Sequence, residues 1–407
     1  MIKIMHHIIL SVGLIIFAAH ALNFIFKKTY IPDVLILIIF GILLGPIFHI
    51  IMLQDFGRVG QVITTIALVV ILFESGCSLD FKVLVRSFKT SGYLTLLSFF
   101  ITTLIVLTFA IVFLNMSFLS GLMLGVILGG TSSAVVVPIT DVLNIHPETK
   151  TTLLLESAAT DVLCILTLFS LIEFSELNQS FDLIKFISSI GTSFVMAVVF
   201  GLLSGTLWLI IIDKLKNFPN SLTTTIAWLF IVYGITEVFG YSGPIAALAF
   251  GLILTNYQSF GFINNYILAR HEIKPLTKVE LDFYKELVFL LKIFFFIYLG
   301  IQFEIKEYYL LVFALGIVTA VFMSRIPLTK YLFKRVDFED RSYISMMAPK
   351  GLAAAVLASI PLTHNIPGSE QIIDIVSMVV VFSIILCAVL VMAFRFKLIK
   401  NLYRKFI

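Results

Sequence analysis

The chain has 407 residues, of which 60% are hydrophobic and 13% are charged, and its formal net charge is +4. Because an average soluble domain carries about 25% charged residues, this composition excludes a soluble domain and indicates a protein embedded in a lipid bilayer. The three cysteines lie in apolar runs without a CxxC spacing, which argues against a disulfide or metal framework. We expect the bilayer itself as a partner, with no nucleic acid and no cofactor.

Apolar runs long enough to cross a bilayer follow one another along the chain. A crossing of about 30 Å takes roughly 20 helical residues. Thirteen runs are suitable, at residues 8–26, 31–52, 59–80, 91–114, 118–139, 150–173, 182–212, 222–239, 242–260, 284–303, 308–332, 343–363 and 371–398. The sequence thus predicts an all-α polytopic membrane protein with about 13 transmembrane helices, in a single domain that covers residues 1–407.

Basic residues are distributed unevenly among the connections between these spans. The connections after odd-numbered spans, with the C-terminal tail, hold 21 Lys and Arg, whereas the N-terminus and the connections after even-numbered spans hold 4. Cytoplasmic loops are enriched in Lys and Arg. We therefore predict a multi-pass protein of the cell (plasma) membrane with its N-terminus outside and its C-terminus in the cytoplasm.

Three stretches of the first half resemble stretches that lie seven spans later. The pairs are "YIPDVLILIIFGILLGP" with "YSGPIAALAFGLIL", "ILFESGCSLDF" with "FFIYLGIQFEI", and "GTSSAVVVPI" with "GLAAAVLASIPL". Because an odd offset reverses the direction of crossing, this pattern is typical of the inverted repeats of secondary transporters. It predicts a first six-helix repeat at residues 8–173 (spans 1–6), a linking helix at 182–212 and a second repeat at 222–398 (spans 8–13).

Spans 5 and 12 correspond in the two repeats, and each carries a helix-breaking stretch, "GGTSSAVVVP" at 129–138 and "APKGLAAAV" at 348–356. Glycine weakens helical order and proline removes a backbone donor, while the hydroxyls of Thr131 and Ser132 can satisfy freed backbone groups. We expect two crossed, interrupted helices that offer carbonyl oxygens to a cation. Alternatively, the glycines only permit close helix crossing, as a GxxxG spacing does.

The first half of the sixth span carries two carboxylates, Glu156 and Asp161, in an apolar run. An ionisable residue within a membrane helix is costly and often marks an ion or proton pathway. Ser157 lies one turn before Asp161 and adds a hydroxyl to the same face. Since Arg325 and Lys350 lie at a depth similar to that of Glu156, we assign Glu156 to a structural ion pair with Arg325 and leave Asp161 free to titrate. Lys350 is expected to oppose the carbonyl end of a broken helix.

Lys292 lies within the tenth span. Three interpretations stay open: it lines the ion funnel, it pairs with Glu74 of the third span, or it extends to the cytoplasmic surface. Only the first two make it part of the transport machinery.

Five stretches together resemble the monovalent cation/proton antiporter superfamily, nearest to its NhaP-type sodium/proton antiporters: "ESAATD", "GTSS", "LFESGCSLDF", "IPDVLILIIFGILLGP" and "LLKIFFFIYLGI". The resemblance covers essentially the whole chain. It implies that Asp161 binds a monovalent cation and a proton in turn, with ligands also at Ser157, at the backbone near Thr131 and at Glu74, and that Glu156 pairs with a basic residue. It also implies a homodimer of thirteen-helix protomers, in which a mobile core domain slides against a dimerisation domain.

The chain departs from the family pattern at the site itself. Thr160 stands where many relatives have Asn or Asp, and Ser132 and Ser133 stand where many have Asp-Pro. Lys350 stands at a position where relatives often have Arg, and Lys and Arg are not equivalent ion-pair partners. Thr160 and Ser132 are kept as site residues, although fewer carboxylates remain to bind ions.

The expected function is the exchange of Na⁺, or alternatively K⁺ or Li⁺, for H⁺ by alternating access. We expect electroneutral exchange, because Asp161 is taken as the only exchangeable carboxylate and Thr160 cannot titrate. A cation channel would use similar oxygen ligands in a continuous pore and is the alternative, together with a K⁺/H⁺ exchanger of the same superfamily. An intramembrane enzyme is more remote, because no HExxH, GxSxG or zinc spacing is present.

Overall fold

The computed structural model describes residues 33–51, 53–143, 145–176, 183–215, 221–260, 276–303 and 307–406, together with residues 13, 14, 16, 17 and 20. Within these residues the backbone forms helices, turns and bends without any strand, which confirms the all-α prediction. The main elements, in chain order, are α2 (Asp33–Ile42), η1 (Leu43–Ile47), α3 (Leu53–Ser78), α4 (Phe81–Leu114), α5 (Phe118–Ile127), α6 (Ser133–Val142), α7 (Pro147–Glu176), α8 (Leu183–Leu215), α9 (Ser221–Val238), α10 (Gly243–Asn256), η2 (Tyr257–Ser259), α11 (Lys278–Gln302), α12 (Tyr308–Leu332), α13 (Phe338–Met346), α14 (Leu352–Ala358), α15 (Ile360–Thr363), α16 (Ser369–Arg395) and α17 (Lys400–Phe406).

Five of the described helices are long and apolar enough to cross a membrane: Ser91–Leu114, Pro147–Ile172, Gly191–Ile212, Tyr308–Leu332 and Ser369–Arg395. Shorter apolar helices occupy the positions of other predicted spans, at Val34–Ile47, Thr65–Ser78, Phe118–Ile127, Leu222–Val238 and Leu352–Thr363. The first predicted span, 8–26, lies almost entirely outside the described residues. The number of thirteen spans therefore stays a prediction.

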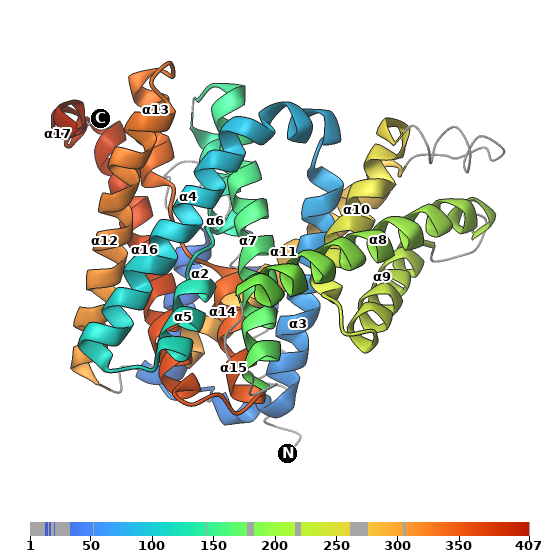
Figure 1. The fold of residues 1–407 in the computed structure, drawn as a ribbon, viewed down its shortest axis with the longest axis horizontal. Helices are drawn as coiled ribbons and strands as arrows, with labels where there is room; N and C mark the ends of the chain where they lie inside the picture. The colour runs from blue at the N-terminus through green and yellow to red at the C-terminus, as the bar shows by residue number, and fades with distance from the viewer. Residues whose placement is uncertain are drawn as a thin grey trace. The chain divides into compact units, whose positions relative to one another are not determined.

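The helices form two compact units. The first contains residues 1–61, 90–161 and 290–407, and the second contains residues 62–89 and 162–289. In the first unit, α12 packs along α16, and α16 also contacts α2, α5 and α14 (Figure 1). In the second unit, α10 packs against α8 and α9. Every residue of the site described below belongs to the first unit unless stated otherwise.

Two interrupted helices of the first unit meet at their breaks. Residues 128–132 separate α5 from α6, and residues 347–351 separate α13 from α14. The backbone N–H of Ser132 donates a hydrogen bond of 2.7 Å to the carbonyl oxygen of Pro349, so the two breaks are joined directly.

The first break is shorter than the stretch predicted from the sequence. The helix resumes at residue 133 and continues through residue 138, so the proline at that position does not end it. A proline keeps a helical φ angle and removes a single backbone hydrogen bond. The expected interruption over 129–138 is therefore corrected to residues 128–132.

Glycines bring helix backbones into contact in both units. In the first unit, a Cβ on Gly41 of α2 would overlap the backbone of α11, and a Cβ on Gly300 of α11 would overlap the backbone of α2. In the second unit, Gly76 of α3 and Gly251 of α10 bring their two helices together in the same way. Small residues at such positions are what allows membrane helices to pack closely.

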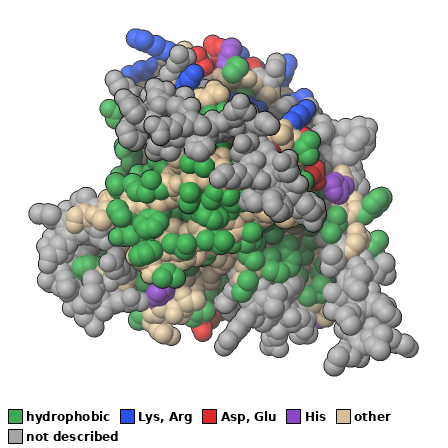
Figure 2. Space-filling model, turned by 90° about the vertical axis from the view of Figure 1, so that its right-hand side faces the viewer, with side chains coloured by type: hydrophobic (Ala, Val, Ile, Leu, Met, Phe, Trp, Pro, Cys, Tyr) green, Lys and Arg blue, Asp and Glu red, His purple; other side chains and the backbone are tan. Residues whose placement is uncertain are grey.

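The surface has the polarity expected of a membrane protein. Figure 2 shows one face, on which Lys, Arg, Asp and Glu side chains gather at the upper end, above an area of hydrophobic side chains. Large apolar side chains are exposed along the membrane-crossing helices, among them Leu104 and Val112 of α4 and Val312 of α12, each more than 60% exposed. Exposed apolar surface of this kind is suited to lipid contact.

Candidate functional site

One stretch of α7 buries four polar side chains. Glu156 is 1% exposed and Asp161 8% exposed, while Ser157 and Thr160 are fully buried. α7 is also one of the helices that are apolar enough to cross a membrane. Polar groups in such a place must find their partners within the protein.

Glu156 forms a two-point ion pair with Arg325 of α12. Arg325 Nη1 and Nη2 each donate to one carboxylate oxygen at 2.5 Å, and the Arg325 side chain is 3% exposed. Ser98 of α4 donates to Glu156 Oε1 at 3.0 Å, and Arg325 Nε donates to the carbonyl oxygen of Ile344 in α13 at 2.9 Å. Because the planar guanidinium matches the carboxylate, the pair holds α4, α7, α12 and α13 in a fixed arrangement.

Hydroxyl groups of α7 hold the first break. Thr160 Oγ1 accepts a hydrogen bond of 3.1 Å from the backbone N–H of Thr131 and lies 3.3 Å from Thr131 Oγ1. Ser157 Oγ donates to the carbonyl oxygen of Thr131 at 2.8 Å. Both backbone groups of Thr131, which the interruption removes from helical bonding, are thus satisfied by α7.

Asp161 has Lys350 of the second break as its charged neighbour. Lys350 is 3% exposed; its ammonium group donates to the carbonyl oxygen of Gly130 at 2.9 Å, and its backbone N–H donates to Ser383 Oγ of α16 at 2.9 Å. The Lys350 ammonium therefore binds a carbonyl group of the first break, as the sequence predicted.

Ser132 and Gly351 lie where the two breaks touch. Ser132 is 5% exposed, and its Oγ is buried without a hydrogen-bond partner among the described residues. A Cβ at Gly351 would overlap this oxygen, so the glycine leaves the space that Ser132 fills. The Ser132 hydroxyl satisfies no freed backbone group, contrary to the expectation from the sequence. Thr160 and the Pro349 carbonyl do so instead.

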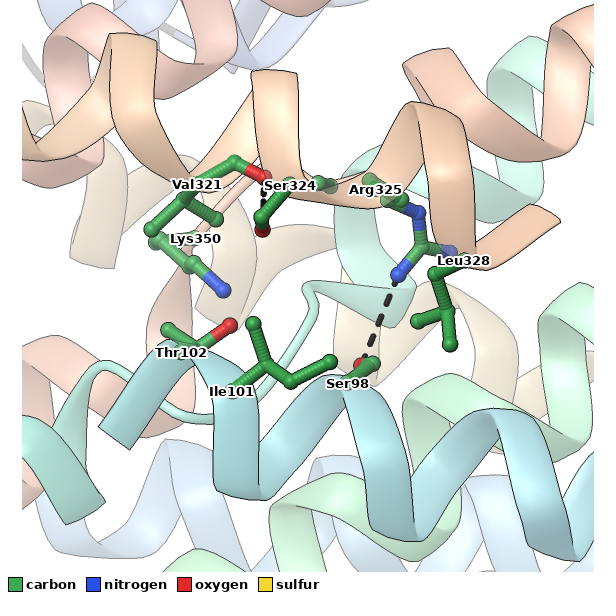
Figure 3. Close-up of a pocket in the computed structure, with 9 residues that line it drawn as sticks. Ser98, Ile101, Thr102, Val321, Ser324, Arg325, Leu328 and Lys350 are labelled. Carbon is green, nitrogen blue, oxygen red and sulfur yellow. Dashed lines mark hydrogen bonds between the residues drawn. The ribbon is translucent and has the colours of Figure 1, made fainter. Parts of the chain in front are cut away.

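A small cavity lies beside Lys350 and Arg325, between α4 and α12 (Figure 3). It has room for about one water molecule. The ammonium of Lys350 and the hydroxyl of Thr102 point toward each other across it, and Ser98 lines it as well. The buried ammonium thus has a small space beside it, with polar groups of Thr102 and Ser98 on its walls.

The remaining predicted site residues are Glu74 and Lys292. Glu74 is half-buried on α3 and belongs to the second unit. Lys292 is half-buried on α11, within the first unit. A role for either in ion binding stays a prediction.

Three hydroxyls of the site were missed from the sequence: Ser98 beside Glu156, Thr102 beside Lys350, and Ser383 at the second break. Their sequence signal is a Ser or Thr within an apolar helix. Most such residues bond to a carbonyl of their own helix, as Thr206 does with Leu202 at 2.7 Å. The pattern alone therefore does not separate a structural hydroxyl from one that serves a site.

The buried residues of α7 and of the first break offer oxygen atoms of three kinds. They are the carboxylate of Asp161, the carbonyl of Thr131 and the hydroxyl of Ser157. Hard cations prefer oxygen ligands, and a carboxylate can take up a proton in place of a cation. Glu156 is less suited to that exchange, because Arg325 already occupies both of its oxygens.

Comparisons with known proteins agree with this chemistry. The family model described as "Sodium/hydrogen exchanger, transmembrane" matches residues 13–394. The "Probable Na(+)/H(+) antiporter 2" of Methanocaldococcus jannaschii is 27% identical over 355 residues, which are 83% of this chain and 80% of that protein. The "K(+)/H(+) antiporter NhaP2" of Shewanella oneidensis is 27% identical over 376 residues, which are 87% of this chain but 60% of NhaP2.

A solved structure shares the fold. The sodium proton antiporter MjNhaP1 from Methanocaldococcus jannaschii at pH 8 superposes with a TM-score of 0.74 and 22% identity, and the match covers 99% of each chain. The two proteins therefore share their fold.

Glu156→Gln is expected to lower stability, because it leaves Arg325 buried without its counter-charge. Breaking a buried pair in this way costs about 3–5 kcal/mol. The measurement is the melting temperature in detergent, compared with that of Glu156→Gln/Arg325→Met, which removes both charges and should melt higher than the single variant. A single variant as stable as the parent would contradict the structural role of the pair.

Gly351→Ala is expected to lower the melting temperature, because the added methyl overlaps the Ser132 side chain. Ser132→Gly in the same chain should recover most of the loss, since it removes the atoms that the methyl meets. Gly234→Ala is the matched control, because a Cβ there has no neighbouring atom within 4 Å. If Ser132→Gly recovers nothing, the contact between the breaks is not what requires glycine.

Proposed function

The chain belongs to the sodium/hydrogen exchanger family, and on that premise we propose that it exchanges Na⁺ for H⁺ across the cell membrane by alternating access. It is a transporter and not an enzyme, and the ions are substrates that it moves without a cofactor. What remains is to assign the cation, the exchange residue and the stoichiometry.

The state of the two α7 carboxylates supports Asp161 as the exchange residue. Both are buried, but only Glu156 has its charge matched by a bidentate partner. Asp161 lies next to the break at Thr131, where a carbonyl and hydroxyls are gathered. A monovalent cation held by Asp161, Ser157 and the Thr131 carbonyl alternates with a proton on Asp161. Thr160 and Ser132 shape this site, and Lys350 compensates the carbonyl groups of the break.

K⁺ is the alternative cation. The relatives at similar identity include proteins named Na⁺/H⁺ antiporters and proteins named K⁺/H⁺ antiporters. The oxygen ligands suit either ion, since both are hard cations. We propose Na⁺ because the matched family and the structurally similar MjNhaP1 carry that ion in their names.

The same proposal includes two inverted repeats, at residues 8–173 and 222–398, joined by a linking helix. Two observations support it. Gly41 and Gly300 bring α2 (span 2) against α11 (span 10), and Gly76 and Gly251 bring α3 (span 3) against α10 (span 9). An offset of seven spans relates span 2 to span 9 and span 3 to span 10, so each contact is the counterpart of the other. In addition, the predicted span that follows each broken span supplies a hydroxyl acceptor to the break. The acceptor is Thr160 of α7 (span 6) for the first break and Ser383 of α16 (span 13) for the second.

The membrane orientation and assembly are also proposals. The distribution of basic residues supports an outside N-terminus and a cytoplasmic C-terminus. A homodimer is proposed from the family resemblance of the sequence. Thirteen spans per protomer follow from the thirteen apolar runs.

Asp161→Asn is expected to abolish cation-dependent proton movement in proteoliposomes while the protein remains folded, because an amide can neither take up a proton nor match the cation's charge. Asp374→Asn is the matched control, since Asp374 is half-buried on the membrane-crossing α16 outside the site. Substantial exchange by Asp161→Asn would contradict the assignment. Testing Na⁺, K⁺ and Li⁺ in turn on the parent identifies the cation.

Exchange is expected to be one for one and electroneutral. The two crossing forms, Asp161 protonated and Asp161 with one bound monovalent cation, carry the same net charge. The measurement is the exchange rate in proteoliposomes at several clamped membrane potentials. A strong dependence of the rate on voltage, or a reversal point away from equal cation and proton gradients, would show that a second charge moves.

A further inference from the structure

The chain reverses direction after α16 and forms a short helix that docks on the end of the first unit. Lys397 has a φ angle of 62°, which turns the chain between α16 and α17. Tyr403 of α17 is 7% exposed, and its ring packs on Phe394 of α16 with 5.7 Å between centroids. Lys400 pairs with Glu339 of α13, and Lys330 of α12 donates to the carbonyl oxygen of Phe406 at 3.0 Å. These contacts fix α17 in one orientation.

α17 crosses the direction of the membrane-crossing helices. In Figure 1, α12 and α13 are seen lengthwise, whereas α17 is seen nearly end-on beside them. Such an orientation at the end of a membrane-crossing helix is the one that an interfacial helix takes.

The segment 396–406 leaves apolar side chains uncovered. Phe396 is 69% exposed, Leu398 77%, Leu402 54% and Phe406 56%. Leu402 and Phe406 are four residues apart, so they lie on one face of α17, while Tyr403, beside that face, holds the helix against α16. The exposed apolar groups follow directly on the membrane-crossing α16.

The same segment, "FKLIKNLYRKF", contains four basic residues and no acidic one. Lys397, Arg404 and Lys405 are exposed. The nearby acidic side chains are already engaged: Glu339 pairs with Lys400, Asp337 pairs with His146 at 3.1 Å, and Asp340 accepts from Thr149 at 2.6 Å. The segment thus contains no acidic side chain that would neutralise the positive charge of its basic residues.

We propose that the segment 396–406 is an interfacial element that binds the headgroups of anionic phospholipids. Apolar side chains on a docked surface helix, with lysine and arginine beside them, match the two layers that a lipid leaflet offers, acyl chains and negative headgroups. Lipid is chosen over a protein partner because the apolar face begins where a membrane-crossing helix ends. Through Glu339 and the Phe338 ring, which lies 5.8 Å from the Arg404 guanidinium, the lipid contact reaches the first residues of α13.

The test uses a tryptophan as a depth and lipid probe. Leu402→Trp is reconstituted in vesicles of phosphatidylcholine and phosphatidylglycerol in which one or the other lipid carries brominated acyl chains. The quenching of the parent's own Trp208 and Trp228 fluorescence is measured separately and subtracted. We expect stronger quenching by the brominated anionic lipid at equal mole fraction. Lys397→Gln/Lys405→Gln in the same chain should remove this preference, whereas Lys82→Gln/Lys285→Gln, an equal loss of charge elsewhere, should retain it.

The outcomes are distinct. Equal quenching by the two lipids would overturn headgroup binding, and absence of quenching would show that another protein surface or a second copy covers the segment. Phe406→Trp provides an independent probe if Leu402→Trp does not fold. Because the measurement does not involve transport, it stands or fails separately from the proposed exchange function.

Discussion

The organisation of the first unit depends on the rule that a backbone group freed within a membrane must be bonded inside the protein. Two helices are interrupted, and each break is satisfied in part by the other, through the hydrogen bond from Ser132 to Pro349 and that from the Lys350 ammonium to Gly130. Further acceptors are supplied by helices later in the chain, Thr160 on α7 for the first break and Ser383 on α16 for the second. Breaks that are bonded in this way form a fixed structure and not a disordered loop.

Glu156 and Asp161 of α7 differ in their interactions because their neighbours differ. Glu156 faces a guanidinium that fills both of its oxygens, and the cost of desolvating this pair is offset only while both partners are present. Asp161 follows Thr160, which bonds to the first break, and its charged neighbour Lys350 donates to the Gly130 carbonyl. Glu156 thus holds helices together, whereas no bidentate partner of that kind is found for Asp161 among the described residues.

Much of this was accessible from the sequence because lipid imposes strong constraints. Helical class follows from apolar run length, and the positions of the interruptions follow from glycine-rich stretches in spans 5 and 12. Comparing depth along the spans pointed to Arg325 for Glu156, and the structure brings the two together. The exact break was not predictable from Pro138, because a proline's effect depends on whether neighbours replace one lost hydrogen bond. Nor were Ser98 and Ser383, whose roles arise from contacts between helices distant in sequence.

Thr160 shows how the structural rule and the transport chemistry meet in one residue. The backbone N–H of Thr131 needs an acceptor at this point, and a carboxylate or an amide at position 160 could also provide one. A threonine hydroxyl supplies the acceptor without a charge, and it donates its own proton to the Ser157 carbonyl at 3.1 Å. The break is therefore held equally well whether Asp161 carries a cation or a proton, because the group that holds it does not titrate. On the proposed mechanism, this separates the support of the ion site from the exchange that takes place within it.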